Sequence, residues 1–454
     1  MIRLTDTLAR FASGRALITV PEAAARTIRN GFIDTLATMI AGRKEPVVRI
    51  VRQHVVARRA QAPESSVLLG AERLPAADAA LINATAAHAL DYDDVALAGH
   101  PSAVLVPALL AEGEAIGASG TDLMCAYLVG YEVWAELISR ESDPYHLKGW
   151  HPTAVFGTVG AAAALARLRG LSADASRNAI ALAASMAAGL VANFGSMTKP
   201  YHAGRAASSA VEAVRLALAG MTAAPDAIEH HAGFLQAISP KGNVDFERPS
   251  TLGGSLRLLD SGLSVKKYPT CYATHRVIDA VIGLTRDSNL QPGDVTSVHA
   301  RIGVAQASML RNHAPETALE AKFSLEFAVA SALVARAAGR AQLQDDFVNS
   351  KAVREAMRKV EISTVESTCP IEPAFAYSDR VQIELTDGRR LDSGEIRFAR
   401  GNAKLPLGED ELKTKFFDCL AGAEPIEAGA LYSRLARLDA VRDVRELASE
   451  PALT

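Results

Sequence analysis

The chain shows helical periodicity up to about residue 260. Apolar side chains, many of them alanine, recur every three to four residues, which predicts helices that pack closely through small side chains. The predicted helices are Ala24–Ala41, Ala76–Leu90, Leu123–Glu141, Val155–Leu168, Ser172–Val191 and Ala206–Ala219. Gly42, Gly170 and Gly220 follow three of them, at positions where a left-handed residue usually ends a helix. This part of the chain predicts an all-α domain.

The pattern changes after residue 260, where strand signals appear. Val298, Ala300, Ile302 and Val304 alternate with polar residues, which is the period of a half-buried strand. Further strands are predicted at Val360–Val365 and Arg380–Leu385, with a turn at 386–388 leading back toward Leu391, and helices are predicted at Thr274–Thr285 and Glu320–Ala338. Strands mixed with helices predict a smaller α+β domain.

From about residue 407 the pattern is helical again, and we expect this end to rejoin the first domain. The predicted fold class is therefore mainly α, with a large all-α domain formed by both chain ends and a smaller α+β domain. The predicted ranges are 1–264 for the first part of the helical domain, 265–402 for the α+β domain and 403–454 for the C-terminal part of the helical domain.

Charge and cysteine content narrow the function classes. Forty-eight basic and 51 acidic residues give a net charge of −3 without a long basic run, which argues against nucleic acid or an anionic membrane as partner. Four widely spaced cysteines form no CxxC pair, so we expect no disulfide framework and a reducing, cytoplasmic location. The N-terminus lacks the features of a signal peptide, and no apolar run is long enough for a transmembrane helix.

The cofactor motifs that carry a clear mechanism do not occur in the sequence. There is no GxxxxGK[ST], no GxGxxG between a strand and a helix, and no HExxH. We therefore expect no nucleotide, nicotinamide or metal cofactor.

Four short polar segments interrupt the alanine-rich background. The first, residues 88–101, places Asp91, Asp93 and Asp94 at the C-terminal end of a predicted helix and continues to His100. The helix dipole disfavours negative charge at that end, and a broken local rule often marks a functional site. The alternative is a solvated acidic loop.

The second polar segment, residues 148–153, contains His151 directly before a predicted helix. Positive potential at a helix N-terminus would keep the imidazole neutral, so that it could act as a base. The alternative is a histidine that only caps the helix or is satisfied in the core.

The third and fourth segments are basic. Residues 195–205 bring Lys199, His202 and Arg205 together before a predicted helix, where exposed amides and cations would bind a carboxylate; a solvated basic turn is the alternative. The fourth, residues 266–275, begins with Lys266 and again precedes a helix, which Thr270 or Thr274 could cap.

These segments resemble the MmgE/PrpD family, whose members include 2-methylcitrate dehydratase, cis-aconitate decarboxylase and iminodisuccinate epimerase. The similarity runs over almost the whole chain and rests on motifs that stand in the order of the family: HALDYDD (88–94), GHPS (99–102), GWHPT (149–153), MTKPYHAG (197–204), KKYPTCYATH (266–275) and EAKFS (320–324).

The resemblance implies a helical domain built from both chain ends, a smaller α+β lid domain, a homodimer, no metal and no organic cofactor, with the active site between the domains. By motif position, the site residues of the decarboxylase correspond to Asp91, His100, His151, Lys199 and Lys266. Two positions depart, because Val95 replaces a threonine of the decarboxylase and Cys271 replaces a histidine. Both departures argue against cis-aconitate decarboxylation specifically.

The three family reactions share a proton transfer at a carbon beside a carboxylate. One positioned base contributes roughly 10²–10⁴ in rate and one oxyanion donor roughly 10²–10³, so we expect a cluster of cations around the acid. Lys199 and Lys266 are the expected carboxylate and enolate stabilisers, His151 the base or acid, Asp91 its orienting partner and His100 an assisting group. The expected contacts of the substrate are His202, Arg205, Tyr145, Cys271 and His275.

The reaction expected first is dehydration of a small di- or tricarboxylic acid similar to 2-methylcitrate. An epimerase acting on an acid such as iminodisuccinate, and a non-catalytic acid-binding protein, are the alternatives, because family and fold do not fix the chemistry of the pocket.

Overall fold

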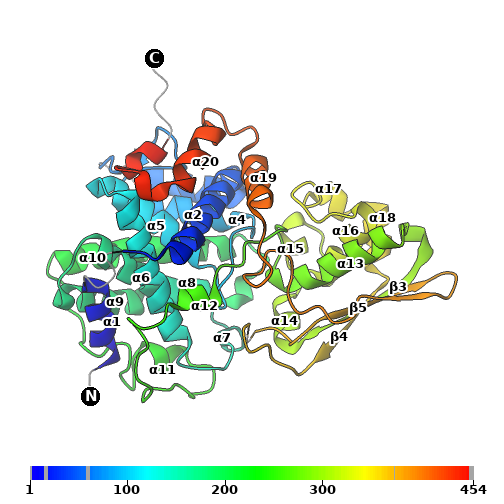
Figure 1. The fold of residues 1–454 in the computed structure, drawn as a ribbon, viewed down its shortest axis with the longest axis horizontal. Helices are drawn as coiled ribbons and strands as arrows, with labels where there is room; N and C mark the ends of the chain where they lie inside the picture. The colour runs from blue at the N-terminus through cyan, green and yellow to red at the C-terminus, as the bar shows by residue number, and fades with distance from the viewer. Residues whose placement is uncertain (1–2, 15–18, 58–61, 373, 449–454) are drawn as a thin grey trace. The chain divides into compact units, whose positions relative to one another are not determined.

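The computed structural model describes residues 3–14, 19–57, 62–372 and 374–448 (Figure 1). The chain divides into two compact units. The first contains residues 1–190, 198–263 and 408–454, and the second contains residues 191–197 and 264–407. We predicted domain boundaries after residues 264 and 402, whereas the two units change after residues 263 and 407. The prediction also left residues 191–197 in the helical domain.

The first unit is built from helices contributed by both ends of the chain. Its helices are α1 (Leu4–Ser13), α2 (Glu22–Gly42), α3 (Pro46–Ala57), α4 (Ala76–Ala89), α5 (Pro101–Ile116), α6 (Gly120–Ile138), α7 (Tyr145–Lys148), α8 (Pro152–Leu168), α9 (Ala173–Met186), α10 (Thr198–Leu218), α11 (Phe234–Ile238), α12 (Arg257–Ser261), α19 (Glu409–Leu420) and α20 (Ala428–Ala436). The unit is not purely helical, because the short strands β1 (Ser65–Ser66) and β2 (Arg73–Leu74) pair antiparallel.

The six predicted helices are all present, with shifted ends. The largest shift is in α10, which begins at Thr198 rather than at Ala206. Pro200 does not prevent this, because the first turn of a helix needs no intrahelical N–H donor. Lys199, His202 and Arg205 therefore lie inside the helix and not before it. Helix α5 was not predicted, since it is buried on almost every side and contains Pro107, so it shows no polar face.

Helix α4 is buried along most of its length and packs against α2, α5 and α10. A Cβ on Gly42 would lie 2.2 Å from the carbonyl oxygen of Ala86, and a Cβ on Gly204 would lie 2.2 Å from Thr85 Oγ1. The prediction for Gly42 was therefore wrong: it is the last residue of α2 and allows a close helix crossing, whereas Gly170 and Gly220 do have positive φ. The close packing fixes the end of α4, from which the candidate site begins.

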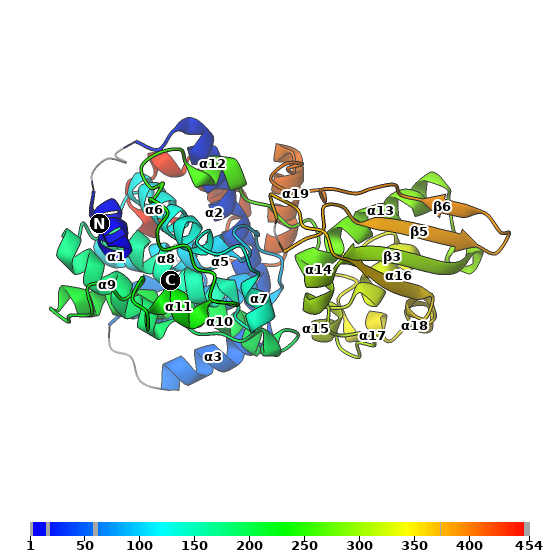
Figure 2. The same cartoon turned by 90° about the horizontal axis from the view of Figure 1, so that it is seen from below.

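The second unit contains a four-stranded sheet in the order β4-β3-β5-β6 (Figure 2). Strand β3 (Val295–Gly303) pairs parallel with β4 (Val360–Val365) and antiparallel with β5 (Arg380–Leu385), which pairs antiparallel with β6 (Arg390–Asp392). Its helices are α13 (His275–Asp287), α14 (Val304–Met309), α15 (Ala318–Ala321), α16 (Leu325–Ala335), α17 (Asp345–Val348) and α18 (Lys351–Met357). Apolar residues of α13, α16, β3 and β5 form one core cluster.

The predicted helix Glu320–Ala338 is divided into α15 and α16 in the structure. Ser324 separates them, because its side chain accepts a hydrogen bond from the Phe327 amide and starts a new helix as its N-cap. The strand predictions at 360–365 and 380–385 agree with β4 and β5.

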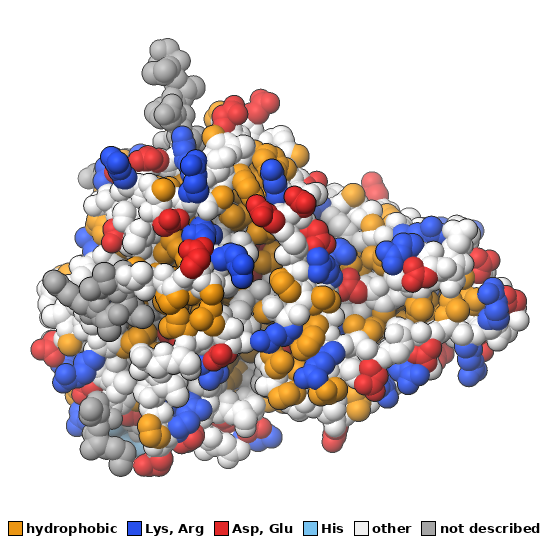
Figure 3. All heavy atoms as spheres, viewed as in Figure 1, with side chains coloured by type: hydrophobic (Ala, Val, Ile, Leu, Met, Phe, Trp, Pro, Cys, Tyr) orange, Lys and Arg blue, Asp and Glu red, His pale blue; other side chains and the backbone are white. Residues whose placement is uncertain are grey.

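Helices account for 55% of the structure and strands for 8%, so the prediction of a mainly α fold is confirmed. Among the described residues, no helix combines the length and apolar character needed to cross a bilayer. On the face seen in Figure 3, acidic and basic side chains are interspersed.

Candidate functional site

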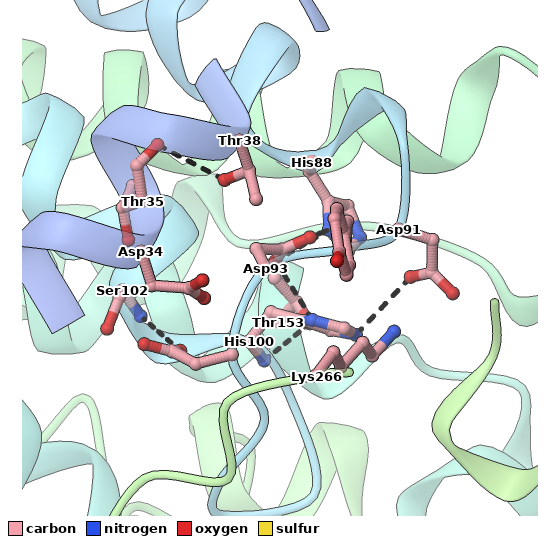
Figure 4. Close-up of polar contacts among 12 residues, drawn as sticks. Asp34, Thr35, Thr38, His88, Asp91, Asp93, His100, Ser102, Thr153 and Lys266 are labelled. Atoms are coloured by element: carbon pink, nitrogen blue, oxygen red, sulfur yellow. Dashed lines mark hydrogen bonds and ion pairs between the residues drawn. The ribbon is translucent and has the colours of Figure 1, made fainter. Parts of the chain in front are cut away.

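The candidate site begins where α4 ends. The chain turns sharply after Ala89, and Asp91 adopts the left-handed backbone conformation with a φ of 51°. That region costs about 1–2 kcal/mol for most L-residues, although aspartate tolerates it better than most. The turn places His88, Asp91 and Asp93 close together in a buried environment (Figure 4).

His88 connects two charged partners. Its Nδ1 lies 3.0 Å from both carboxylate oxygens of Asp93, and its Nε2 lies 2.8 Å from Lys199 Nζ. Lys199 Nζ also donates to Asp91 Oδ1 at 2.7 Å, in an ion pair whose side chains are each 5% exposed. The first turn of α10 and the end of α4 are thus joined by one buried lysine.

The charge states follow from burial and from these partners. Burial is the main cause that lowers the pKa of His88 to about 4, and Lys199 adds to the effect. Burial alone would raise the pKa of Asp93, but the imidazoles of His88 and His100 hold it well below its usual value. An ionised carboxylate only accepts hydrogen bonds, so His88 carries its proton on Nδ1. Its Nε2 is then the acceptor for Lys199.

His100 and His151 occupy equivalent positions at two helix starts. Each is an N-cap residue followed directly by a proline, His100 for α5 and His151 for α8. His100 Nδ1 lies 2.9 Å from Asp93 Oδ2, its Nε2 lies 3.7 Å from Asp91 Oδ1, and its backbone N–H donates to Thr153 Oγ1 at 3.1 Å. The start of α8 therefore holds the histidine at the start of α5.

His151 is 1% exposed, and its ring stacks on that of His88 with the centroids 5.8 Å apart. Its Nδ1 lies 3.2 Å from Nδ1 of His202. Burial and then Lys199 lower the pKa of His151 well below 6.5, and the same two causes lower that of His202 to about 4. His151 is thus neutral mainly because it is buried, and not mainly because it precedes a helix.

The neutral state of His202 changes the predicted cation cluster. A neutral imidazole can form hydrogen bonds but carries no net charge. In the carboxylate-binding segment predicted at residues 195–205, only Lys199 and Arg205 therefore carry positive charge. Arg205 is half-buried, and its described hydrogen bond runs along its own helix to Ser209 Oγ at 3.3 Å. Of the two predicted cations in the first unit, Lys199 is the one whose described contacts include a histidine of the site.

A second layer of carboxylates supports the Asp91–Asp94 turn. Burial, followed by the nearby Asp34 carboxylate, raises the pKa of Asp94 well above 3.8, and Asp94 Oδ1 accepts from the Ser102 amide at 3.4 Å. Lys415 of α19 lies 2.5 Å from Asp34 and donates to the carbonyl oxygen of Tyr92 at 2.7 Å. The C-terminal end of the chain thus fixes the turn that carries Asp91.

Tyr145 was predicted as a contact of the substrate. It is 3% exposed, packs edge-on against Phe156 at 4.8 Å, and its hydroxyl has no hydrogen-bond partner among the described residues. Burial, with a contribution from Glu141, raises its pKa further above 10. The adjacent His146 has its pKa lowered to about 4 by burial and then by Lys199, so this histidine lies within electrostatic range of the site.

The remaining predicted residues belong to the second unit. Lys266 is fully buried and donates to the carbonyl oxygen of Thr270 at 3.0 Å. Cys271 is buried, and its backbone N–H donates to the carbonyl oxygen of Lys322. His275 is the first residue of α13, with Nε2 3.3 Å from the same Thr270 carbonyl. The three residues therefore gather around one tight turn.

Residues 6–247 match the MmgE/PrpD N-terminal domain, and residues 268–431 match the MmgE/PrpD C-terminal domain. The chain belongs to the MmgE/PrpD family. It is 29% identical to the cis-aconitate decarboxylases of Mus musculus and Homo sapiens, over 91% of this chain and 86% and 87% of theirs. It is 25% identical to the cis-aconitate decarboxylase of Aspergillus terreus, over 86% of this chain and 84% of that protein.

In this MmgE/PrpD protein, His88, Asp91, Asp93 and His100 have the ligand types and spacing to hold a metal ion, with ligand atoms within 4.8 Å of one another. Lys199 competes with that arrangement, because its Nζ already lies at hydrogen-bond distance from His88 and Asp91. A divalent ion there would meet a buried positive charge at a few ångströms, which is strongly unfavourable. We therefore regard Lys199 as the cation of this cluster.

No role in the site was assigned from the sequence to His88, Asp93, His146 or Lys415. His88 and Asp93 stand inside the HALDYDD motif, but nothing in the spacing showed that His88 faces Lys199 across 111 positions. Lys415 did leave a signal, because it follows Leu412 by three residues and precedes Cys419 by four on the buried face of α19. A lysine on the apolar face of a helix needs a buried partner.

We predict that Lys415→Met destabilises the protein by about 3–5 kcal/mol, because Asp34 would be left buried without its counter-charge. Urea unfolding followed by circular dichroism measures the effect. Lys413→Met, on the exposed face of the same helix, is the matched control and should stay within about 0.5 kcal/mol of wild type. An unchanged urea midpoint for Lys415→Met would show that the contacts of Lys415 with Asp34 and Tyr92 contribute nothing to stability.

A second prediction concerns pH. Between pH 6.5 and about 4 the unfolded chain binds a proton at His88 that the folded protein does not bind, so the free energy of unfolding falls as the pH falls through this window. The slope contributed is at most about 1.4 kcal/mol per pH unit. His146 and His202 titrate in the same range. The wild-type protein is therefore compared with His88→Gln, which lacks the pH dependence that comes from His88.

The stability difference between wild type and His88→Gln should shrink as the pH falls from 6.5 to 4, as measured by urea unfolding at each pH. His54→Gln, at an exposed position of α3, controls for the substitution itself. A difference that stays constant over this range would mean that His88 is not held neutral.

Proposed function

We propose that this MmgE/PrpD protein is a cofactor-independent lyase that moves a proton at a carbon next to a carboxylate of a small di- or tricarboxylic acid. The observation that carries the proposal is the position of Lys199. It is a buried cation held by Asp91 and by the bare nitrogen of His88, with the neutral imidazoles of His151 and His202 close by.

This arrangement separates the two requirements of carbon-acid chemistry. A fixed cation stabilises the negative charge that develops on a carboxylate when the adjacent carbon loses a proton, and it does so without reorganisation. A neutral imidazole has an unprotonated ring nitrogen that can accept this proton. Charged histidines could not act as bases, so burial of these rings favours the reaction.

We propose dehydration as the reaction, with a hydroxy acid similar to 2-methylcitrate as substrate. The base takes the proton from the carbon beside the carboxylate, the carbon–carbon double bond forms, and hydroxide leaves with a proton from an acid. Lys266 enters by its place in the family motif as the second stabilising lysine. The similarity to cis-aconitate decarboxylases supports a lyase acting on a small carboxylic acid.

Decarboxylation of a cis-aconitate-like acid is the second candidate, because the curated relatives named above carry that activity in their names. Loss of carbon dioxide leaves the same kind of charge beside a carboxylate, which an acid then protonates. We place this reaction second since Val95 and Cys271 stand where the decarboxylase has threonine and histidine.

The test is a panel of acids incubated with the purified protein in deuterated water and followed by proton NMR. The panel contains 2-methylcitrate, citrate, cis-aconitate and iminodisuccinate. A new alkene signal from a hydroxy acid supports dehydration, and carbon dioxide release from cis-aconitate supports decarboxylation. Deuterium uptake with loss of optical rotation alone would indicate an epimerase. Thermal stabilisation by an acid without any exchange would overturn the proposal in favour of a binding protein.

With the substrate found, Lys199→Met should lower kcat/KM by about 10²-fold or more, because the fixed cation is lost while the overall shape of the side chain is kept. Lys148→Met, an exposed lysine at the end of α7, is the matched control and should keep the wild-type value. Unchanged kcat/KM in Lys199→Met would contradict the role given to this lysine.

A further inference from the structure

Two buried histidines of the first unit face each other through the same ring atom. Nδ1 of His151, at the start of α8, lies 3.2 Å from Nδ1 of His202, in the second turn of α10. The rings are tilted by 54° with the centroids 5.4 Å apart, so the contact is a hydrogen bond between ring edges and not a stack. Their exposed fractions are 1% and 7%.

The backbone around Gly189 permits this close approach. The His151 amide donates to the carbonyl oxygen of Gly189 at 3.0 Å, which fixes the start of α8 against the chain that leads into α10. A Cβ on Gly189 would lie 2.6 Å from Ala154 Cβ and 3.2 Å from Nδ1 of His202. A side chain at that position would therefore push His202 away from its partner.

Proton counting gives the states of the pair. Two neutral imidazoles carry two ring protons on four nitrogens, and a hydrogen bond between the Nδ1 atoms uses one of them. The ring that donates from Nδ1 has a bare Nε2, and the ring that accepts at Nδ1 carries its proton on Nε2. One ring of the pair is thus ready to act as a base while the other is ready to act as an acid.

We propose that His151 and His202 form a proton relay, in which the Nδ1–Nδ1 hydrogen bond links one Nε2 that accepts a proton to a second Nε2 that donates one. This inference rests on the proposed lyase function and deepens it, because it names both the base and the acid. It also gives His202 a role in proton transfer, whereas the sequence predicted that His202 helps to bind a carboxylate of the substrate.

The relay balances its protons over one turnover. The bare Nε2 of the first ring takes the proton from the substrate carbon, and this ring passes its Nδ1 proton to Nδ1 of the second ring. The second ring then releases its Nε2 proton to the leaving hydroxide. The first ring ends with its proton on Nε2 and the second with its proton on Nδ1, so the charge of the pair is unchanged. After the product leaves, water takes the Nε2 proton of the first ring, the Nδ1 proton passes back, and water returns a proton to Nε2 of the second ring, which restores the starting state.

The surroundings favour two neutral rings over a shared positive charge. Lys199 acts on both histidines, His88 lies over His151, and His100 contributes to the same field. A protonated pair would add positive charge beside the lysine in a buried site. The state in which the pair carries an extra proton is therefore unfavourable, and we expect it to exist only during the transfer from the first ring to the second.

The first test needs no substrate. With histidine labelled with ¹⁵N, NMR should show scalar coupling across a hydrogen bond between two different Nδ1 atoms of the wild-type protein. His202→Asn should remove the coupling and one of the two signals, which assigns the pair. Two uncoupled Nδ1 atoms, or two Nε2-protonated rings, would overturn the relay even if the enzyme is active.

The second test separates proton transfer from positioning. His202→Asn places an amide where Nδ1 stood, so it can still hydrogen-bond His151 but cannot pass a proton on. We expect kcat to fall by about 10²-fold with KM changed by less than about threefold, in line with the loss of one acid–base group. The exposed His230→Asn is the matched control and should keep the wild-type kcat.

The outcomes of the two tests are distinct. Wild-type turnover in His202→Asn would overturn the relay and leave the lyase proposal standing with His151 acting alone. If the wild-type protein transforms no acid of the panel, the proposed function fails. The coupling between the two Nδ1 atoms then decides whether the proton-sharing pair exists.

Discussion

The structure of the candidate site depends on the buried ion pair between Lys199 and Asp91. Removing two charges from water costs several kcal/mol per ion, and such a pair is tolerated only when further hydrogen bonds satisfy both partners. Here His88 Nε2 supplies the second acceptor for Lys199, and Asp93 fixes the tautomer that leaves this nitrogen bare. The left-handed turn at Asp91 brings the carboxylate to the lysine, and the contact of Lys415 with the Tyr92 carbonyl holds that turn.

This arrangement divides positive charge and basicity between different side chains. Lysine carries the charge, and the histidines around it stay neutral because burial and the lysine itself lower their pKa values. A site in which the histidines were also positively charged would bind an acid tightly but would contain no base. The proposed carbon-acid chemistry needs both kinds of group within a few ångströms, and the described contacts place a lysine beside neutral imidazoles.

Much of this site could be found from the sequence, because the motifs that broke local rules were the right segments. Asp91, His100, His151 and His202 all lie in one buried cluster with Lys199. Asp91 and Asp93, at the wrong end of α4, are explained by the lysine and the histidines that face them. His88 could not be found, since its partner is distant in sequence and an alanine-rich helix gives no sign of which side faces it. The position of Lys199 within α10 was missed because the apolar pattern predicted that this helix begins only at Ala206.

Lys199 is held in place by His88, which is neutral and accepts its hydrogen bond at Nε2. The most direct measurement is the ¹⁵N chemical shifts of the His88 ring at neutral pH, assigned by loss of the signals in His88→Gln. We expect one protonated nitrogen, Nδ1, and one bare nitrogen, Nε2, with the bare nitrogen titrating only near pH 4. A ring protonated on both nitrogens at neutral pH, or on Nε2 alone, would contradict it, because Lys199 would then have no acceptor on His88.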